Sequence, residues 1–130
     1  MVNDSRNIKD AHKILQDAWL FASTQWDVLY PKSPKPFITC TTRGEASQKA
    51  ALASGASKAK FGQSAHNFSP SFAFDIAFKN EKGALDWTPK LFEMFAKIVD
   101  SKYKIQIEWG GSWKFYDAPH FEIRGWKSLK

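Results

Sequence analysis

The chain has 130 residues and a formal net charge of +6 at pH 7, and hydrophobic residues make up 43% of it. This length and apolar content are enough for one domain with its own core, which excludes an intrinsically disordered chain. The single cysteine, Cys40, excludes an internal disulfide framework and fits synthesis in a reducing cytoplasm.

No apolar run follows the charged N-terminal segment, so we expect no signal peptide, and no stretch approaches 18 continuous apolar residues, so we expect no stable membrane insertion. The positive charge is compatible with nucleic acid, anionic lipid or an anionic polymer of the bacterial envelope. It is equally compatible with an ordinary basic surface, so charge alone does not choose among these partners.

The first elements follow from apolar spacing and from proline. Residues 8–29 have apolar side chains at helical intervals and predict one long amphipathic helix, which the three prolines of residues 30–36 end. Residues 37–42, "FITCTT", predict a strand. Residues 45–55, "EASQKAALASG", predict a short helix that ends at Gly55, and a loop is expected over residues 57–71.

Residues 72–78, "FAFDIAF", alternate and predict a strand with one face of large apolar side chains and Asp75 between Ala73 and Ala77 on the other. Thr88 as N-cap and Pro89 at the first position predict a helix through residue 102. Residues 103–109 and 120–123 predict two more strands around a loop. The expected class is α+β: a single domain over residues 1–130, with a mostly antiparallel sheet and flanking helices.

Two short segments concentrate side chains that could bind a metal. His66 and Asp75 lie in "SAHNFSPSFAFD", residues 64–75, and Asp117 and His120 lie in "DAPHF". A catalytic zinc takes three ligands from histidine and carboxylate, and a further carboxylate can take a proton from water. Structural histidine and aspartate with backbone partners would explain the spacing as well. His12, among charged residues, is expected at the surface.

The order of the motifs resembles the zinc peptidases of the D-alanyl-D-alanine carboxypeptidase and L-alanyl-D-glutamate endopeptidase family, which includes vancomycin-resistance dipeptidases and phage endolysins. The matching positions are Ser64, His66, Ala73, Asp75, Trp109, Gly110, Gly111, Asp117 and His120. An upstream segment also resembles the family through Arg43, Gln48, Gly55 and Ser57. The resemblance runs from residue 37 to residue 123. Eight residues, 67–74, separate the histidine from the aspartate, two more than in the commoner family form, so we expect a longer loop with the same ligands.

The resemblance implies the Hedgehog/DD-peptidase-like fold and one zinc ion per chain, bound by His66, Asp75 and His120. It implies Asp117 as the general base. Arg43 is implied as a catalytic and substrate-binding residue that meets a substrate carboxylate or a developing oxyanion.

Ser64 is implied to orient either the loop or the substrate. Trp109 and Trp113 are expected to wall the cleft. Glu108 and Glu122 are rival carboxylates, each on a predicted strand, where packing or support of a metal ligand is the more common role.

The implied substrate is the stem peptide of peptidoglycan, cleaved at the L-alanyl-D-glutamate bond. The implied setting is a monomeric phage endolysin, made in the host cytoplasm and acting on the cell wall in the periplasm after release. A D-alanyl-D-alanine carboxypeptidase remains the nearest alternative. A non-catalytic zinc-binding domain of the same fold would not need Asp117, and no nucleic-acid partner is expected because the aromatic residues have core spacing.

Overall fold

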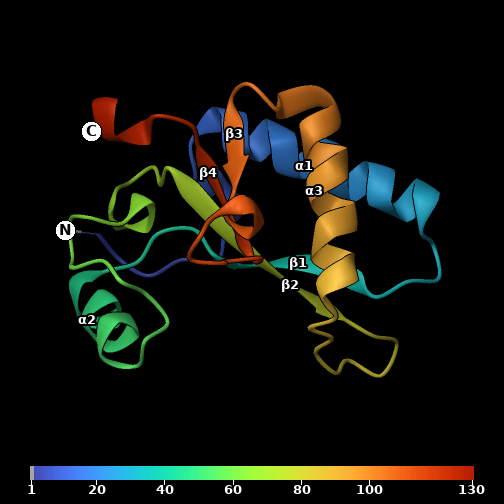
Figure 1. The fold of residues 1–130 in the computed structure, drawn as a ribbon, viewed down its shortest axis with the longest axis horizontal. Helices are drawn as coiled ribbons and strands as arrows, with labels where there is room; N and C mark the ends of the chain where they lie inside the picture. The colour runs from blue at the N-terminus through green and yellow to red at the C-terminus, as the bar shows by residue number, and fades with distance from the viewer. Residues whose placement is uncertain (1) are drawn as a thin grey trace.

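Helices and strands in mixed order build one antiparallel sheet in the computed structural model, which describes residues 2–130 (Figure 1). The sheet has the strand order β1-β2-β4-β3. Its strands are β1 (Lys35–Cys40), β2 (Ala73–Lys79), β3 (Ile107–Trp109) and β4 (His120–Ile123). The α-helices are α1 (Lys13–Leu29), α2 (Glu45–Ala53) and α3 (Pro89–Tyr103). Short 3-10 turns are η1 (Ile8–Asp10), η2 (Ala65–Asn67), η3 (Gly110–Ser112) and η4 (Trp126–Ser128). The predicted α+β class is therefore confirmed.

The core lies between one face of the sheet and the helices α1 and α3, which contact each other and cross in Figure 1. Phe74, Ile76 and Phe78 of β2 are fully buried on this face, as the alternation predicts. The ring of Phe78 lies 5.2 Å from that of Trp26 in α1, measured between centroids. Each of these large side chains contributes about 1.5–3 kcal/mol by leaving water. Asp75, between them in sequence, points to the opposite face.

The first α-helix begins later than the apolar pattern predicts. Residues Ile8–Asp10 form η1, and α1 starts at Lys13. The Ser71 amide donates to the Asp10 carbonyl at 2.9 Å, and the His12 amide donates to the Ser71 carbonyl at 2.9 Å. This segment therefore pairs with the chain that leads into β2, which ends the helical hydrogen bonding.

His12 is half-buried rather than on the surface as expected, with its ring 6.2 Å from that of Phe72. Strand β1 starts two residues before the predicted range, at Lys35, and ends at Cys40. Strand β3 is shorter than predicted because Tyr103 is the last residue of α3 and is buried in the core. Thr88 does precede α3, but its hydroxyl donates to Asp86 instead of capping the helix. No helix within residues 2–130 is long and apolar enough to cross a membrane.

Candidate metal and catalytic site

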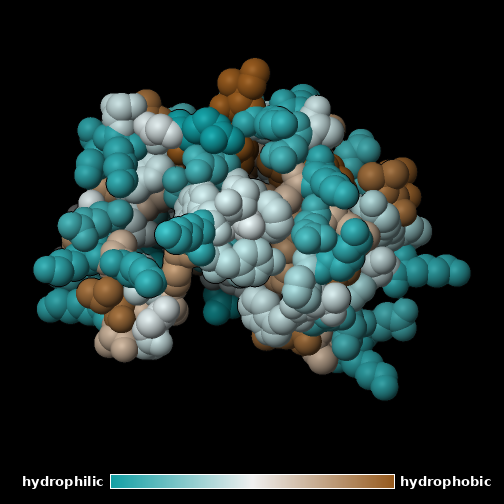
Figure 2. Space-filling view, in the orientation of Figure 1, coloured by the Kyte–Doolittle hydropathy of each residue, from teal (hydrophilic) through white to brown (hydrophobic). Residues whose placement is uncertain are grey.

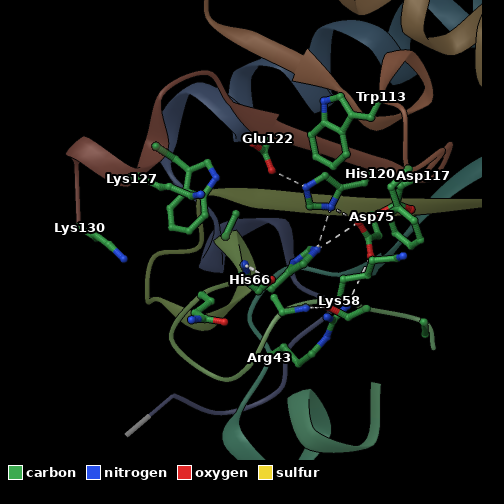
Figure 3. Close-up of a pocket in the computed structure, with 18 residues that line it drawn as sticks. Arg43, Lys58, His66, Asp75, Trp113, Asp117, His120, Glu122, Lys127 and Lys130 are labelled. Carbon is green, nitrogen blue, oxygen red and sulfur yellow. Dashed lines mark hydrogen bonds and ion pairs between the residues drawn. The ribbon is translucent and has the colours of Figure 1, made fainter. Parts of the chain in front are cut away.

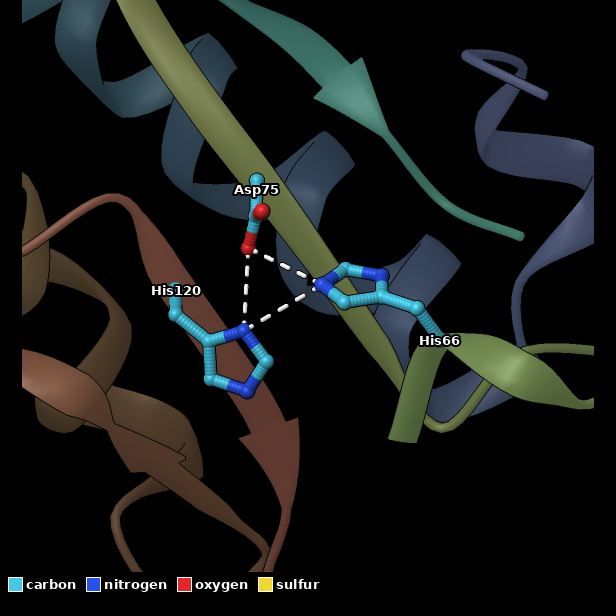
Figure 4. A group of neighbouring side chains, drawn as sticks. All are labelled: His66, Asp75 and His120. Carbon is cyan, nitrogen blue, oxygen red and sulfur yellow. Dashed lines mark hydrogen bonds and ion pairs between the residues drawn. The ribbon is translucent and has the colours of Figure 1, made fainter. Parts of the chain in front are cut away.

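Three predicted ligands converge although they are far apart in sequence. In the pairing of β2 with β4, Asp75 stands directly opposite His120. Side chains directly opposite in an antiparallel pair lie on the same face and within contact distance. His66 approaches from η2, and one ligand atom from each of the three residues lies within 4.8 Å of the others (Figure 4).

The backbone fixes the orientation of the His66 ring. Its Nδ1 lies 2.7 Å from the carbonyl oxygen of Thr41, which can only accept a hydrogen bond. Nδ1 therefore carries a hydrogen. In the neutral ring the lone pair then belongs to Nε2, which lies 3.1 Å from Oδ1 of Asp75. The nitrogen that faces the group is thus the one free to bind a metal.

His120 is oriented by a carboxylate of its own strand. Glu122 is two residues further along β4, so its side chain lies on the same face. Its Oε1 lies 2.8 Å from Nε2 of His120, whereas Nδ1 of that ring lies 2.9 Å from Oδ1 of Asp75. Glu122 thus has the supporting position in which a carboxylate holds the ring of a metal-ligating histidine. Of the two rival carboxylates, Glu108 instead accepts a hydrogen bond from the indole of Trp113 at 2.7 Å.

The charges of the three residues are strongly coupled. Burial lowers the pKa of both histidines, but the charge of Asp75 and the hydrogen bonds to the rings outweigh it. The pKa of His66 rises to about 10 and that of His120 to about 9. Burial conversely raises the pKa of Asp75, but the two imidazolium rings hold it well below its ordinary value. Without a metal, these pKa shifts favour the protonated form of both rings and the ionised form of Asp75.

Two imidazoles and one carboxylate are a donor set that zinc accepts, and it leaves a coordination position for a reactant. The inward nitrogens of His66 and His120 lie only 3.3 Å apart, so protons held between them can be replaced by one cation. The residues beside Asp75 on the same strand face, Ala73 and Ala77, have small side chains that leave room for it. The residues present therefore fit a zinc ion.

Asp117 lies in the same cavity but outside the group of three. Burial raises the pKa of its carboxyl group above the ordinary value, and the nearby charge of His120 only partly offsets this. The loop before β4 sets its position. The Asp117 amide donates to the Gly110 carbonyl at 3.0 Å, and a Cβ atom at residue 110 would collide with the Asp117 carbonyl oxygen. A glycine is therefore required at residue 110.

Arg43 lies at the edge of the group, where its Nη2 is 3.7 Å from Oδ2 of Asp75. Its Nη1 donates to the side chain of Gln48 at 3.1 Å. Gln48 is fully buried in α2 and also accepts from Asn67 of η2 at 3.1 Å. Asn67 in turn donates to the Arg43 carbonyl, so one polar network holds Arg43 and the segment that carries His66. Sequence reasoning missed Asn67, because only the tertiary contact distinguishes it from any loop asparagine.

Ser64 lines the cavity, and its hydroxyl accepts from the backbone amide of His66 at 3.2 Å. Its observed contact therefore orients the η2 turn. Trp113 also lines the cavity, with its ring 5.2 Å from that of His120. Trp109 does not wall the cavity as expected. Its ring packs on Phe121 in the core, and its indole donates to a backbone carbonyl.

The cavity that contains these residues has a volume of about 650 Å³ (Figure 3). It combines three side chains that could hold a metal, a half-buried carboxylate outside that group and a permanent cation at its edge. These are the side chains of a metal-dependent hydrolase.

Residues 57–123, just over half of the chain, match the family model described as D-alanyl-D-alanine carboxypeptidase, and the chain belongs to this family of peptidases. The fold is similar to the crystal structure of the Serratia marcescens L-Ala D-Glu endopeptidase ChiX. That comparison has a TM-score of 0.72 and 23% sequence identity, and it covers 95% of this chain and 86% of that chain. No curated protein sequence matches.

Proposed function

We propose that the protein is a zinc-dependent peptidase that hydrolyses the stem peptide of peptidoglycan at the L-alanyl-D-glutamate bond. The observation that carries the proposal is the meeting of His66, Asp75 and His120 in one cavity, with Asp117 in the same cavity but outside their group. The family match supports peptide hydrolysis. The fold shared with an L-Ala D-Glu endopeptidase supports the choice of bond.

Each side chain has a distinct role in the proposed reaction. One zinc ion per chain would be held by His66, Asp75 and His120, and it would supply a Lewis acid that acidifies water and polarises a carbonyl. Asp117 takes the proton of the attacking water and passes it to the departing amine. Its raised pKa makes it a stronger base than an ordinary aspartate, because burial disfavours its charged form. Arg43 binds a substrate carboxylate or the negative charge that develops on the carbonyl oxygen.

The proposed biological setting is phage lysis. In this setting the protein is made in the host cytoplasm, acts on the cell wall in the periplasm after release, and works as a monomer. The motif order that it shares with phage endolysins supports this setting.

A second candidate function is D-alanyl-D-alanine carboxypeptidase activity, which the description of the matching family model favours. The two activities cut different bonds of the same peptide. An endopeptidase leaves a new N-terminal D-glutamate, whereas a carboxypeptidase releases free D-alanine.

Mass spectrometry of purified peptidoglycan digested with the zinc-loaded protein tests both functions. New N-terminal D-glutamate is the expected product, and Asp117→Asn provides the matched blank. Free D-alanine without new D-glutamate ends would replace the first proposal with the second. No product of either kind would refute both.

A further inference from the structure

The longer segment between His66 and Asp75 packs against Trp126, which lines the cavity. Phe68, within this segment, lies with its ring 5.4 Å from that of Phe72 and 5.8 Å from that of Trp126. Trp126 also stacks on Phe72 at 5.9 Å and is only 5% exposed. We call these three rings, Phe68, Phe72 and Trp126, the aromatic seat. Their contacts hold the C-terminal turn η4, which begins at Trp126, against the segment before β2.

The aromatic seat places two lysines at the cavity. Lys127 and Lys130 both line it. The Nζ atom of Lys130 lies 5.8 Å from the ring centroid of Trp126 and 6.0 Å from that of Phe68, and Nζ of Lys127 lies 5.9 Å from the Trp126 ring. Such contacts hold an ammonium group over an aromatic face but leave its charge unneutralised.

These two lysines have no carboxylate partner within residues 2–130. Lys13, Lys35 and Lys90, on other surfaces, each pair with an acidic side chain. Of the three acidic side chains that line the cavity, Asp75 and Glu122 have other partners, and Asp117 lies on the other side of His66 from the two lysines (Figure 3). Asp75 contacts both histidines and Arg43, and Glu122 is bonded to His120. Lys127 and Lys130 therefore present positive charge to a ligand that enters the cavity.

The position of Lys127 and Lys130 in the cavity matters as much as their charge. In Figure 3, Lys127 and Lys130 lie on one side of His66, and Asp117 lies on the other. A ligand that spans the group of three side chains would therefore meet the general base near one part and the lysines near another. Charge attraction over such a cavity favours a ligand with a carboxylate some distance from the reacting bond.

We propose that Lys127 and Lys130, held by the aromatic seat, form a carboxylate-binding subsite for the substrate peptide, separate from Arg43. This rests on the proposed function, because the stem peptide is the ligand that brings free carboxylates into the cavity. The longer loop thereby contributes to specificity, since Phe68 contacts Trp126 at the start of the C-terminal segment that carries both lysines.

The test uses the zinc-loaded protein and the peptide L-alanyl-γ-D-glutamyl-L-lysine in three forms. One form has both carboxylates free, one has the D-glutamate α-carboxyl amidated, and one has the C-terminal carboxyl amidated. The variants are Lys127→Gln with Lys130→Gln, and Lys127→Arg with Lys130→Arg. A matched control, Lys9→Gln with Lys82→Gln, removes the same charge from exposed positions outside the cavity.

The glutamine pair is expected to raise KM about three- to tenfold on the free peptide, with kcat within about twofold, because exposed ion pairs are individually weak. On one of the two amidated peptides, the KM of the glutamine pair should equal that of the wild-type protein. The arginine pair and the control should match wild type on the free peptide, and circular dichroism should confirm the fold of each variant.

An unchanged KM on the free peptide, an equal rise on all three forms, or an arginine pair that behaves like the glutamine pair would each overturn the subsite. Failure of the wild-type protein to cleave any form is a different result. It would refute the proposed function itself, and the subsite with it.

Discussion

Asp117 and Glu122 are two carboxylates in one cavity with different surroundings. Glu122 is hydrogen-bonded to the His120 ring at 2.8 Å, whereas burial raises the pKa of the Asp117 carboxyl group. Only Asp117 is therefore free to accept a proton from water. Asp117→Asn should keep the metal and lose about 100- to 10,000-fold in turnover, measured with a stem peptide beside zinc analysis.

Glu122→Gln is the matched comparison for that substitution, because it makes the same chemical change in the same cavity. Its amide oxygen can still accept from His120, so we expect a smaller loss than for Asp117→Asn. If Asp117→Asn cleaves at the wild-type rate while Glu122→Gln is inactive, the base has been assigned to the wrong residue.

The raised histidine pKa values predict proton release when zinc binds. At pH 7 both rings of the metal-free protein hold protons, since the pKa of His66 is about 10 and that of His120 about 9. Zinc needs neutral imidazole, so binding at pH 7 should release about two protons, and zinc affinity should increase as the pH rises toward 9. Calorimetry in two buffers of different ionisation enthalpy measures this. A binding heat that does not depend on the buffer would contradict it.

At the scale of elements, the loop between β3 and β4 must approach itself closely to place Asp117. A methyl group on Gly110 would collide with the Asp117 carbonyl. Gly110→Ala should lower the free energy of unfolding by about 1–3 kcal/mol, because the backbone must shift. The same shift should reduce turnover by up to about 100-fold, since small misplacements of a catalytic group are costly.

Chemical denaturation and peptide turnover of the same protein samples measure both effects. Ser112→Ala, in the same loop but exposed, is the control and should change either quantity little. A Gly110→Ala protein with wild-type stability and wild-type turnover would show that the loop position is not tightly constrained.

The elements that local pattern determines could be predicted from sequence, and those that depend on distant partners could not. The alternation in residues 72–78 placed Phe74 and Asp75 on opposite faces of β2 as the structure has them. The start of α1 depends on Ser71, which is about sixty residues away, so the apolar pattern placed it too early. The turn η4 was missed, because its place depends on the contact of Trp126 with Phe68.

The residues of the candidate site also fall into those that could be predicted from sequence and those that could not. Motif order was enough to propose His66, Asp75 and His120, and the strand register explains why two of them meet. The support that Glu122 gives to His120 was one of the two roles expected from its place on a strand, because residues two apart share a strand face. The network through Asn67 arises only from tertiary structure, since nothing in the local sequence distinguishes this asparagine from one at the surface.

For the whole molecule, the net charge of +6 is a property of the surface rather than of the catalytic group. Figure 2 shows hydrophilic side chains around much of the outline of one face, with paler and hydrophobic side chains between them. We expect this charge to attract the protein to the anionic cell wall. Lysis of outer-membrane-permeabilised cells should then fall steeply with salt, because the Debye length shortens from about 10 Å at 0.1 M to about 3 Å at 1 M.

Cleavage of a short soluble stem peptide should fall less over the same range, because the reaction takes place within the cavity. Both assays need one protein batch and constant free zinc. Equal salt sensitivity in the two assays would remove the case for attraction to the wall.

The central claim, that His66, Asp75 and His120 hold a catalytic zinc, is tested most directly by titrating the metal-stripped protein with zinc while its peptide turnover is followed. Turnover should rise with bound zinc and level off at about one ion per chain, because one set of three ligands is present. His66→Ala and His120→Ala should each lose tight zinc binding and turnover together. Full turnover in the stripped protein, or full zinc content in both variants by elemental analysis, would contradict the claim.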